Sequence, residues 1–385
     1  MRNPKLGMMA IGIVLLSIII VLFNRSSSVS IKRNEIAMAP VSGIATQSCV
    51  LSTQIDSLSF TRDGESIFLL AKSHENKDRH VLRCSAKDIG AIQVLRETQT
   101  VLQGLAISPD TGHVYTGQWR SGPKNEPEIL ELNRLTGQTL RKFQGSVSGL
   151  GLQVTSDPTA IGMSPDGTTV IAGSKLVDAQ YVAGGHIGGE ICAWNSNSGD
   201  LLWRNNTVHT NIVRTIAFSP DGKSVGSAGE DSLIRIWDVA SGDLRRTLVG
   251  VLWGGVISMQ FSPDGAFLAT GGSGTEEGGY VRVWDVSSEK IARLFLPFKR
   301  GSNVHVVFDS TGRLAAASQS EESTKDSPTF EVHLWEAKTF AHRGVIGKGT
   351  GYVRALAAAP NKPIIAAGTS SGELIVYDLQ TIAEQ

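Results

Sequence analysis

The sequence contains few cysteines and no excess of charge of either sign. Its three cysteines, Cys49, Cys84 and Cys192, lie far apart and show no CxxC, CxxCH or Cys/His ligand spacing. This absence argues against a disulfide framework, a structural zinc site and a covalently bound haem. Thirty-six basic residues balance 36 acidic residues. Because no field of one sign draws the chain toward a phosphate backbone, we do not expect it to bind nucleic acid.

Charged residues are also scarce, at 19% of the chain, whereas glycine is abundant, with 42 residues. This combination is typical of short, half-buried strands that are joined by many tight turns. The length of 385 residues exceeds the usual size of one domain, but closed all-β folds often reach it as a single unit.

One long uncharged run is present at the N-terminus, LGMMAIGIVLLSIIIVLF, residues 6–23. At about 1.5 Å per residue, a helix of this length nearly crosses the roughly 30 Å hydrocarbon core of a membrane. The alternative is a cleaved secretory signal, but its apolar region usually has about 7 to 15 residues and is followed directly by small residues. The small-x-small pattern at residues 37–39 lies 14 residues beyond Phe23. We therefore expect residues 1–23 to form an uncleaved, single-pass membrane helix.

Basic residues flank this run on both sides: Arg2 and Lys5 before it, and Arg25, Lys32 and Arg33 after it. The side of the membrane on which the rest of the chain lies therefore stays open. Residues 24–45 are polar and small and show no periodicity, so we expect a flexible tether between the membrane and a folded domain.

The rest of the chain repeats one pattern seven times. An apolar residue and a turn of Ser-Pro-Asp-Gly type are followed by an apolar segment, and then by a strand that ends in an aromatic–acidic pair or a relative of it. One more strand, such as LRRTLV at 244–249, gives four short strands per unit. The turns begin at Phe60, Ile107, Met163, Phe218, Phe261, Phe308 and Ala358.

A four-stranded sheet of this size cannot bury both of its faces alone, so neighbouring sheets must stack on it. Seven antiparallel units that close radially predict an all-β, seven-bladed β-propeller. The seventh unit lacks a fourth strand, because only LQTIAEQ follows Asp378, whereas TQSCVLS at 46–52 precedes the first unit. We expect this N-terminal strand to complete the last blade, so that the propeller spans residues 46–385.

The fourth unit, FSPDGKSVGSAGEDSLIRIWD, resembles the repeat of WD-repeat β-propellers, and the resemblance covers about residues 46–380. In that family a His, a Ser or Thr, an Asp and a Trp of one blade form a buried hydrogen-bond network. The resemblance gives His209, Ser227, Asp231 and Trp237 this structural role, and no catalytic one. Other units keep the network only in part: Gly278 replaces the Asp, and Cys84, Leu132 and Tyr377 replace the Trp.

The loops between the second and third strands are mostly long and varied, whereas the Ser-Pro-Asp-Gly turns are short and uniform. By family geometry the long loops share one face with the connections between units, and we expect that face to bind a partner. Aromatic and Arg side chains dominate binding energy at protein interfaces. The alternative is that these loops vary without function and their aromatic side chains fold back on the blades. The candidate residues are Trp119, Arg120, Tyr181, Arg214, Trp253, Tyr352 and Arg354.

Among these candidates, Arg214 and Arg354 occupy the same place in two units, where side chains are expected to face the central opening. Sequence motifs that are typical of enzymes are matched only weakly. GTSSG at 368–372 fits GxSxG in letters only, because no strand-to-helix elbow surrounds it. A loop with four possible metal ligands is more often solvated than a metal site, and we expect no metal and no cofactor. These four residues are His74, Glu75, Asp78 and His80.

The expected function is that of a membrane-tethered, non-enzymatic scaffold that binds a protein or peptide through its loop-rich face. The alternative is a quinoprotein-like dehydrogenase or another cofactor-binding propeller. AWNSNSGDLLW at 193–203 resembles the blade motif of quinoprotein dehydrogenases, where tryptophans dock neighbouring sheets around a pyrroloquinoline quinone. The motif occurs once here, and Asn195 stands where an Asp is usual.

Overall fold

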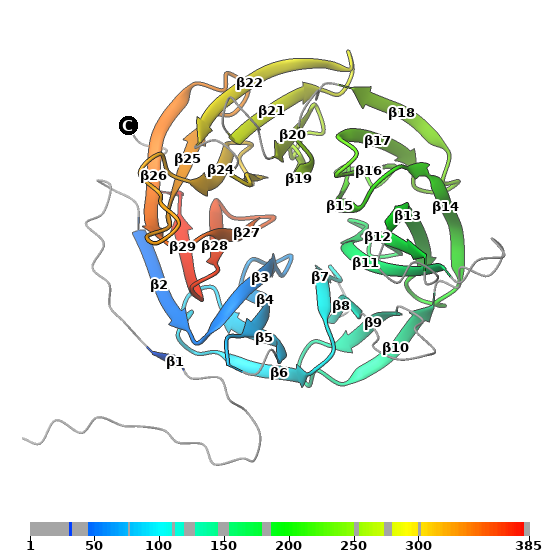
Figure 1. Ribbon diagram of the computed structural model, residues 1–385, viewed down its shortest axis with the longest axis horizontal. Coiled ribbons are helices and arrows are strands. Elements are labelled where there is room, and N and C mark those ends of the chain that lie inside the picture. The colour runs from blue at the N-terminus through cyan, green and yellow to red at the C-terminus, as the bar shows by residue number, and fades with distance from the viewer. Residues whose placement is uncertain are drawn as a thin grey trace, which may run out of the picture.

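The computed structural model describes residues 31–32, 45–75, 78–109, 112–118, 128–144, 154–178, 186–249, 254–272, 279–298 and 302–380. These residues form 29 strands in seven antiparallel sheets that surround a central opening as blades (Figure 1). The prediction of an all-β, seven-bladed propeller is confirmed. The expected membrane helix, residues 1–23, lies outside the described residues, and none of the described residues forms a helix that could cross a membrane.

In each of the first six blades the four strands follow one another in the chain, from the innermost strand to the outer one. Blade 1 contains β3 (Thr53–Phe60), β4 (Ser66–Ser73), β5 (Arg79–Ser85) and β6 (Gln93–Thr98). Blade 2 contains β7 (Leu102–Ile107), β8 (His113–Gln118), β9 (Glu128–Asn133) and β10 (Thr139–Gln144). Blade 3 contains β11 (Val154–Met163), β12 (Thr169–Asp178), β13 (His186–Asn195) and β14 (Leu201–His209).

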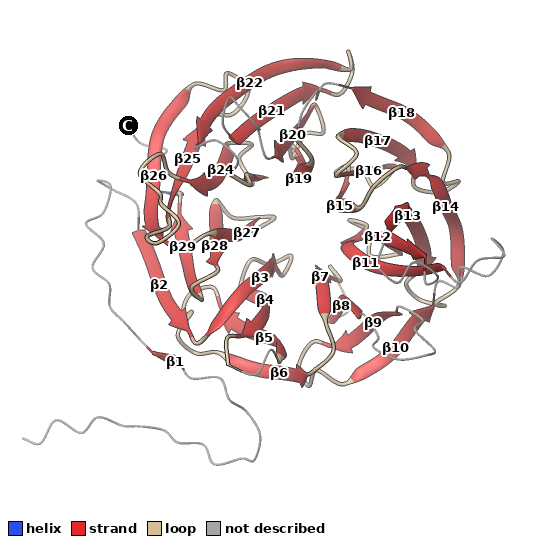
Figure 2. Ribbon diagram, viewed as in Figure 1, coloured by secondary structure: helices blue, strands red, loops and turns tan. Residues whose placement is uncertain are grey.

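The same order continues around the ring, and Figure 2 draws in tan the loops and turns that the structure describes. Blade 4 contains β15 (Val213–Phe218), β16 (Ser224–Gly229), β17 (Leu233–Asp238) and β18 (Leu244–Val249). Blade 5 contains β19 (Val256–Phe261), β20 (Phe267–Gly272), β21 (Gly279–Asp285) and β22 (Lys290–Phe298). Blade 6 contains β23 (His305–Phe308), β24 (Leu314–Gln319), β25 (Thr329–Trp335) and β26 (His342–Thr350).

Blade 7 joins the two ends of the propeller. It contains β27 (Val353–Ala358), β28 (Ile364–Thr369), β29 (Glu373–Asp378) and β2 (Ala45–Leu51), which pairs with β29. The predicted closure by an N-terminal strand is therefore confirmed. Most of the predicted tether, residues 24–45, lies outside the described residues. Within it, Ile31 and Lys32 form β1, an unpredicted fifth strand that pairs with the end of β2.

The repeated turns explain why the strands reverse where they do. In blade 4 the Ser219 hydroxyl donates to Asp221 Oδ1 at 2.6 Å and accepts the Ser224 N–H at 3.0 Å. The hydrogen bond from Ser219 lowers the pKa of Asp221. Gly222 follows with φ at 70°, a conformation that glycine adopts without a steric penalty. This turn is thus specified locally, before any packing between blades.

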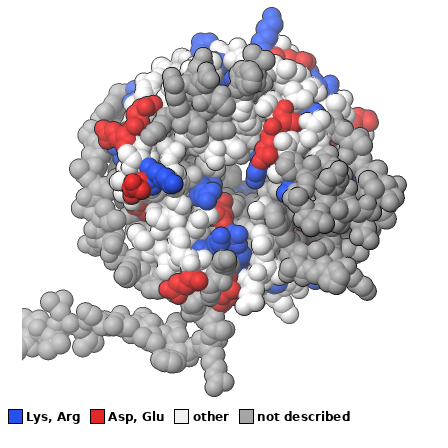
Figure 3. Space-filling view, viewed as in Figure 1, with Lys and Arg blue, Asp and Glu red and all other residues white. Residues whose placement is uncertain are grey.

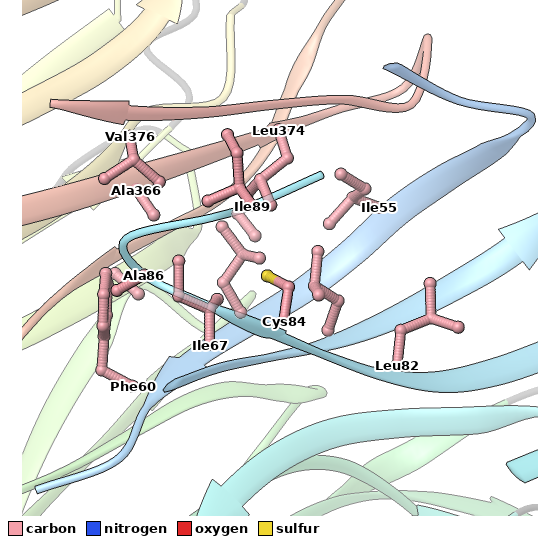
Figure 4. Close-up of a cluster of buried hydrophobic side chains, with 14 of the residues drawn as sticks. Ile55, Phe60, Ile67, Leu82, Cys84, Ala86, Ile89, Ala366, Leu374 and Val376 are labelled. Atoms are coloured by element: carbon pink, nitrogen blue, oxygen red, sulfur yellow. The ribbon is translucent and has the colours of Figure 1, made fainter. Parts of the chain in front are cut away.

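The core lies between neighbouring blades rather than at the centre of the ring. Figure 4 shows the cluster at the closure, where apolar side chains of blades 1 and 7 meet. Each sheet is buried on both faces, and this burial favours the closed ring. The cluster includes Ile55, Phe60, Ile67, Leu82 and Cys84 from blade 1, and Ala366, Leu374 and Val376 from blade 7.

Candidate binding site at the central channel

A cavity of about 1190 Å³ occupies the centre of the ring, and all seven innermost strands line it. Its wall also includes Glu230, which follows the second strand of blade 4, and Gly255, Asn303 and Tyr352 from connections between blades. These two kinds of connection therefore meet at one mouth of the channel. Figure 3 shows the disc hollowed at its centre, with both basic and acidic side chains around the hollow.

The innermost strands share a local irregularity that aims side chains into this channel. In six blades the pairing between the innermost and second strands shifts by one residue, which leaves one extra residue on the innermost strand. Such a β-bulge leaves the extra residue unpaired and redirects its side chain. The extra residues are Asp56, Gly104, Thr159, Arg214, Ile257 and Arg354, and all of them line the cavity.

Blade 6 pairs regularly from His305 onward, and His305 lines the same cavity. We call these seven residues, Asp56, Gly104, Thr159, Arg214, Ile257, His305 and Arg354, the channel ring. The ring combines acidic, basic, hydroxyl, apolar and imidazole groups around one opening.

Three members of the channel ring are already engaged within the protein. Asp56 accepts hydrogen bonds from Gln54 Nε2 and Arg79 Nη1. The Thr159 hydroxyl contacts the Val213 carbonyl and lies 3.1 Å from the Gly173 carbonyl, so it links blades 3 and 4.

Arg214 is the third engaged member. Its Nε donates to Glu230 Oε1 at 2.9 Å, and its Nη2 contacts the same oxygen. The positive charge of Arg214 is therefore balanced inside its own blade.

Arg354 differs, because it is exposed and has no hydrogen-bond or ion-pair partner among the described residues. Burial in the channel wall, together with the charge of Arg354, lowers the pKa of His305 to about 4. His305 is therefore neutral near pH 7 and adds no charge. Lys72, on β4 of blade 1, lines the same cavity and also has no partner among the described residues.

Blade 4 carries a second polar arrangement, which is buried away from the channel. His209 Nδ1 lies 2.9 Å from Asp231 Oδ2, and His209 Nε2 lies 2.7 Å from Ser227 Oγ. Trp237 Nε1 donates to the same hydroxyl at 2.7 Å. Burial opposes the charge of Asp231, but hydrogen bonds from His209 and Arg235 outweigh it and lower its pKa to about 2. The structure thus brings the four sequence-predicted residues into one network, whose interior position suits a structural role.

A family model described as "WD domain, G-beta repeat" matches residues 204–238 and 243–285. These segments contain the buried network of blade 4 and the third strand of blade 5, where Trp284 Nε1 donates to Thr270 Oγ1 at 3.2 Å. The chain is a WD40-repeat seven-bladed β-propeller. Beyond the matched segments the WD40 propeller keeps the architecture with other side chains, since Cys84, Leu132 and Tyr377 are buried at the Trp position.

Curated relatives resemble the WD40 propeller over short stretches. An uncharacterized WD repeat-containing protein of Synechocystis is 48% identical over 67 residues, which cover 17% of this chain and 19% of the relative. WD repeat and SOCS box-containing protein 1 of Homo sapiens is 36% identical over 99 residues, 25% of this chain and 23% of the relative. The periodic tryptophan protein 2 homolog of Dictyostelium discoideum is 24% identical over 183 residues, 45% of this chain and 19% of the relative. The chain thus spans less than a quarter of the length of these relatives.

The structure places three of the seven candidate binding residues of the WD40 propeller at the channel, namely Arg214, Tyr352 and Arg354. The other four, Trp119, Arg120, Tyr181 and Trp253, lie outside the described residues.

Sequence reasoning missed the other members of the channel ring. A regular signal was available, because each bulge residue except Gly104 lies four residues before the apolar residue that begins the turn. Counting back from Phe60, Met163 and Phe261 finds Asp56, Thr159 and Ile257, as counting back from Phe218 and Ala358 finds the two arginines.

The possible metal ligands of blade 1 do not gather, since no group of three or more His, Cys, Asp or Glu in the described ranges could hold a metal ion. The expectation of a solvated loop is wrong for His80, which is fully buried. It is wrong because β5 begins at Arg79, so His80 belongs to a strand. Burial lowers the pKa of this imidazole.

The two tryptophans of the quinoprotein-like segment pack between blades and do not line the channel. Trp194 makes an edge contact with Phe143 of blade 2, with ring centroids 6.4 Å apart. Trp203 Nε1 donates to the Val239 carbonyl of blade 4 at 2.8 Å. Both side chains are thus accounted for by the stacking of blades.

Proposed function

We propose that this WD40 propeller is a non-enzymatic scaffold that binds a protein or peptide partner at the face around the channel mouth. WD40-repeat propellers are typically protein-binding scaffolds. The observation that carries the proposal is the channel ring, because five of its bulges redirect side chains of different chemistry toward one opening. A rim of mixed polar, charged and apolar groups suits recognition of a protein surface.

The most reactive residue types of blade 4 support this proposal, because they are engaged elsewhere. His209 and Asp231 are buried and bonded to each other and to Ser227. A general base must come within hydrogen-bond reach of the proton that it removes. These side chains lie inside the blade and hold it together instead.

Affinity capture with the full-length chain in detergent-solubilised extract tests the scaffold. A variant with Arg120, Arg214, Trp253 and Arg354 changed to Ala is compared with a control that carries Lys223→Ala and Asp200→Ala in turns away from the channel mouth. We expect a partner that the wild type and the control retain and the variant loses, and that binds the purified chain directly. Equal retention by all three chains, with folding intact by circular dichroism, would show that this face does not bind the partner.

We also propose that residues 1–23 anchor the protein in a membrane. The support is the 18-residue uncharged run at residues 6–23. The test is membrane fractionation with alkaline carbonate washing of the full-length chain and of a chain that begins at residue 24. We expect only the full-length chain to stay in the membrane pellet. Release of the full-length chain by carbonate would contradict the anchor.

A further inference from the structure

Blades 4 and 7 place an arginine in the same backbone setting. Arg214 and Arg354 are both bulge residues, and each follows a valine that pairs with the last residue of the second strand. The residue that follows the second strand is Glu230 in blade 4 and Ser370 in blade 7. The Glu230 N–H donates to the Ile212 carbonyl at 3.0 Å, and the Ser370 N–H donates to the Tyr352 carbonyl at 2.8 Å. The two positions are therefore structurally equivalent.

The residues that follow the second strand differ in their side chains: Glu230 offers the arginine a carboxylate, and Ser370 does not. In blade 4 the Glu230 carboxylate accepts two contacts from Arg214. In blade 7 the Ser370 hydroxyl accepts the Tyr352 N–H at 3.0 Å, and no carboxylate among the described residues contacts Arg354. Blade 7 thus repeats the site of blade 4 without its anion.

The surroundings of Arg354 favour an anion from outside. The lining of the cavity includes four cations, Lys72, Arg79, Arg214 and Arg354, and only two anions, Asp56 and Glu230. Arg79 and Arg214 are paired with these two anions, which leaves Lys72 and Arg354 uncompensated among the described residues. An anion that enters the channel mouth is therefore attracted toward blades 7 and 1.

An aromatic side chain stands beside this position. Tyr352 is 37% exposed, whereas its equivalent in blade 4, Ile212, is 7% exposed. An exposed Tyr next to an unpaired Arg is a pairing that protein interfaces favour. A small inorganic anion would use the charge of Arg354 but leave Tyr352 uncovered, so the combination fits a peptide better.

We propose that Arg354 binds a carboxylate that an acidic segment of a partner protein inserts into the channel mouth, in the place that Glu230 fills in blade 4. Tyr352 contacts the neighbouring residues of that segment, and Lys72 adds attraction from blade 1. This inference rests on the proposed scaffold function and names the chemistry of its partner. Hydrogen bonds between charged groups are the stronger ones, so the arginine–carboxylate contact supplies a large part of the binding.

The first test uses a defined probe, the blocked amino acid N-acetylglutamate α-amide, and its neutral isostere N-acetylglutamine amide. The full-length chain, labelled with ¹⁵N at arginine side chains and held in mild detergent, is titrated by NMR. We expect a saturable shift of the Arg354 Nε–H signal with the glutamate probe and none with the glutamine probe. Equal shifts with both probes overturn the proposal. A response to inorganic phosphate alone also overturns it, in favour of a small-anion site.

Two variants make the test independent of folding. Arg354→Gln removes the cation, and Ser370→Glu supplies the blade 4 carboxylate within the chain, so each is expected to weaken binding of the glutamate probe, measured by calorimetry, at least about tenfold. Ser370→Gln has nearly the shape of Ser370→Glu without its charge, and it is expected to keep the response. If Ser370→Glu and Ser370→Gln behave alike, the carboxylate is not what Arg354 recognises.

The same variants separate this inference from the scaffold itself. A partner that is captured equally by the wild type, Arg354→Gln and Ser370→Glu would leave the scaffold standing and show the carboxylate contact to be wrong. A glutamate response at Arg354 without any captured partner would contradict the scaffold and keep the anion site.

Discussion

Blades 4 and 7 have the same strand register but satisfy their polar groups in opposite ways. Blade 4 contains the buried network of Ser227 and Trp237 and an internal ion pair at the channel. In blade 7 the register puts Ala367 and Tyr377 at those two positions, and the tyrosine hydroxyl is buried without a partner in the described part of the chain. Blade 4 is therefore complete in itself, whereas blade 7 depends on β2 for its fourth strand and gives Arg354 no partner among the described residues.

The difference shows that one backbone template can hold an arginine either with or without a carboxylate partner in its own blade. A polar group that is satisfied within the blade stabilises it, while the same group left unpaired at the channel is available to a partner. Four experiments test this comparison, in decreasing order of the change that we expect.

The dependence of blade 7 on β2 is tested by shortening the chain. A chain that begins at residue 53 lacks β2 and exposes the edge of β29, so we expect it to aggregate or remain unfolded. A chain that begins at residue 44 keeps β2 and is expected to fold. Circular dichroism and size-exclusion chromatography compare the two. Cooperative unfolding of the shorter chain would show that blade 7 is stable without closure.

The buried networks are compared by one substitution in each blade. Ser227→Ala leaves His209 and Trp237 without their shared partner, and we expect it to lower the free energy of unfolding by about 3 kcal/mol. Tyr377→Phe removes a hydroxyl that has no partner among the described residues, so a change below about 1 kcal/mol is expected. Urea denaturation followed by tryptophan fluorescence measures both. Equal losses would mean that blade 7 contains a network of its own.

The charge of Arg354 is tested through pH. The folded pKa of His305 is about 4, below the value of about 6.5 in an unfolded chain, so the unfolded state binds the proton more tightly. Stability is therefore expected to fall as pH decreases from 7 toward 4, by about 2 kcal/mol from this group at pH 5.

Arg354→Gln removes one of the two causes of this shift. The pKa of His305 is then expected to rise, and the loss of stability at pH 5 to become smaller. NMR titration of the His305 ring measures the pKa directly. An unchanged pKa would show that the charge of Arg354 does not reach this imidazole.

The smallest effect on stability is expected from Glu230→Gln, which converts the channel site of blade 4 into one like that of blade 7. The ion pair of Arg214 is partly exposed, so its loss is expected to lower the free energy of unfolding by less than about 1 kcal/mol. The same change frees a second arginine, and the number of N-acetylglutamate amide molecules bound per chain is expected to rise from one to two. Unchanged stoichiometry would argue that Arg214 and Arg354 are not equivalent.

Much of the fold was predictable, because in blades 1, 3, 4 and 5 the turn of Ser-Pro-Asp-Gly type fixes the hairpin locally through the same hydroxyl and carboxylate contact. The seven copies and the missing fourth strand after Asp378 were enough to predict the propeller and its closure. The short strand β1 was not predictable, because Ile31 and Lys32 carry no periodic pattern and gain their strand conformation only from pairing with β2.

The candidate site was predictable only in part. Position within the repeat placed Arg214 and Arg354 near the opening, since both lie four residues before the turn. Whether each arginine has a carboxylate partner in its own blade depends on the residue that follows the second strand, Glu230 or Ser370. These two residues can be recognised as equivalent only from the pairing register of the strands. The low pKa of His305 likewise depends on burial in the channel wall and, to a smaller extent, on Arg354, 49 positions away in the chain, and no local pattern reveals either cause.

The pairing of β2 with β29 also sets the order of events during synthesis. Strand β2 leaves the ribosome before any other strand of the blades, and its partner is the last of them to appear. Until β29 appears, therefore, the edge of β2 that pairs with β29 has no partner, and these contacts of the longest sequence separation form after the strands of all the other blades exist. Completion of the ring thus requires β29, and a chain truncated shortly before residue 373 cannot close.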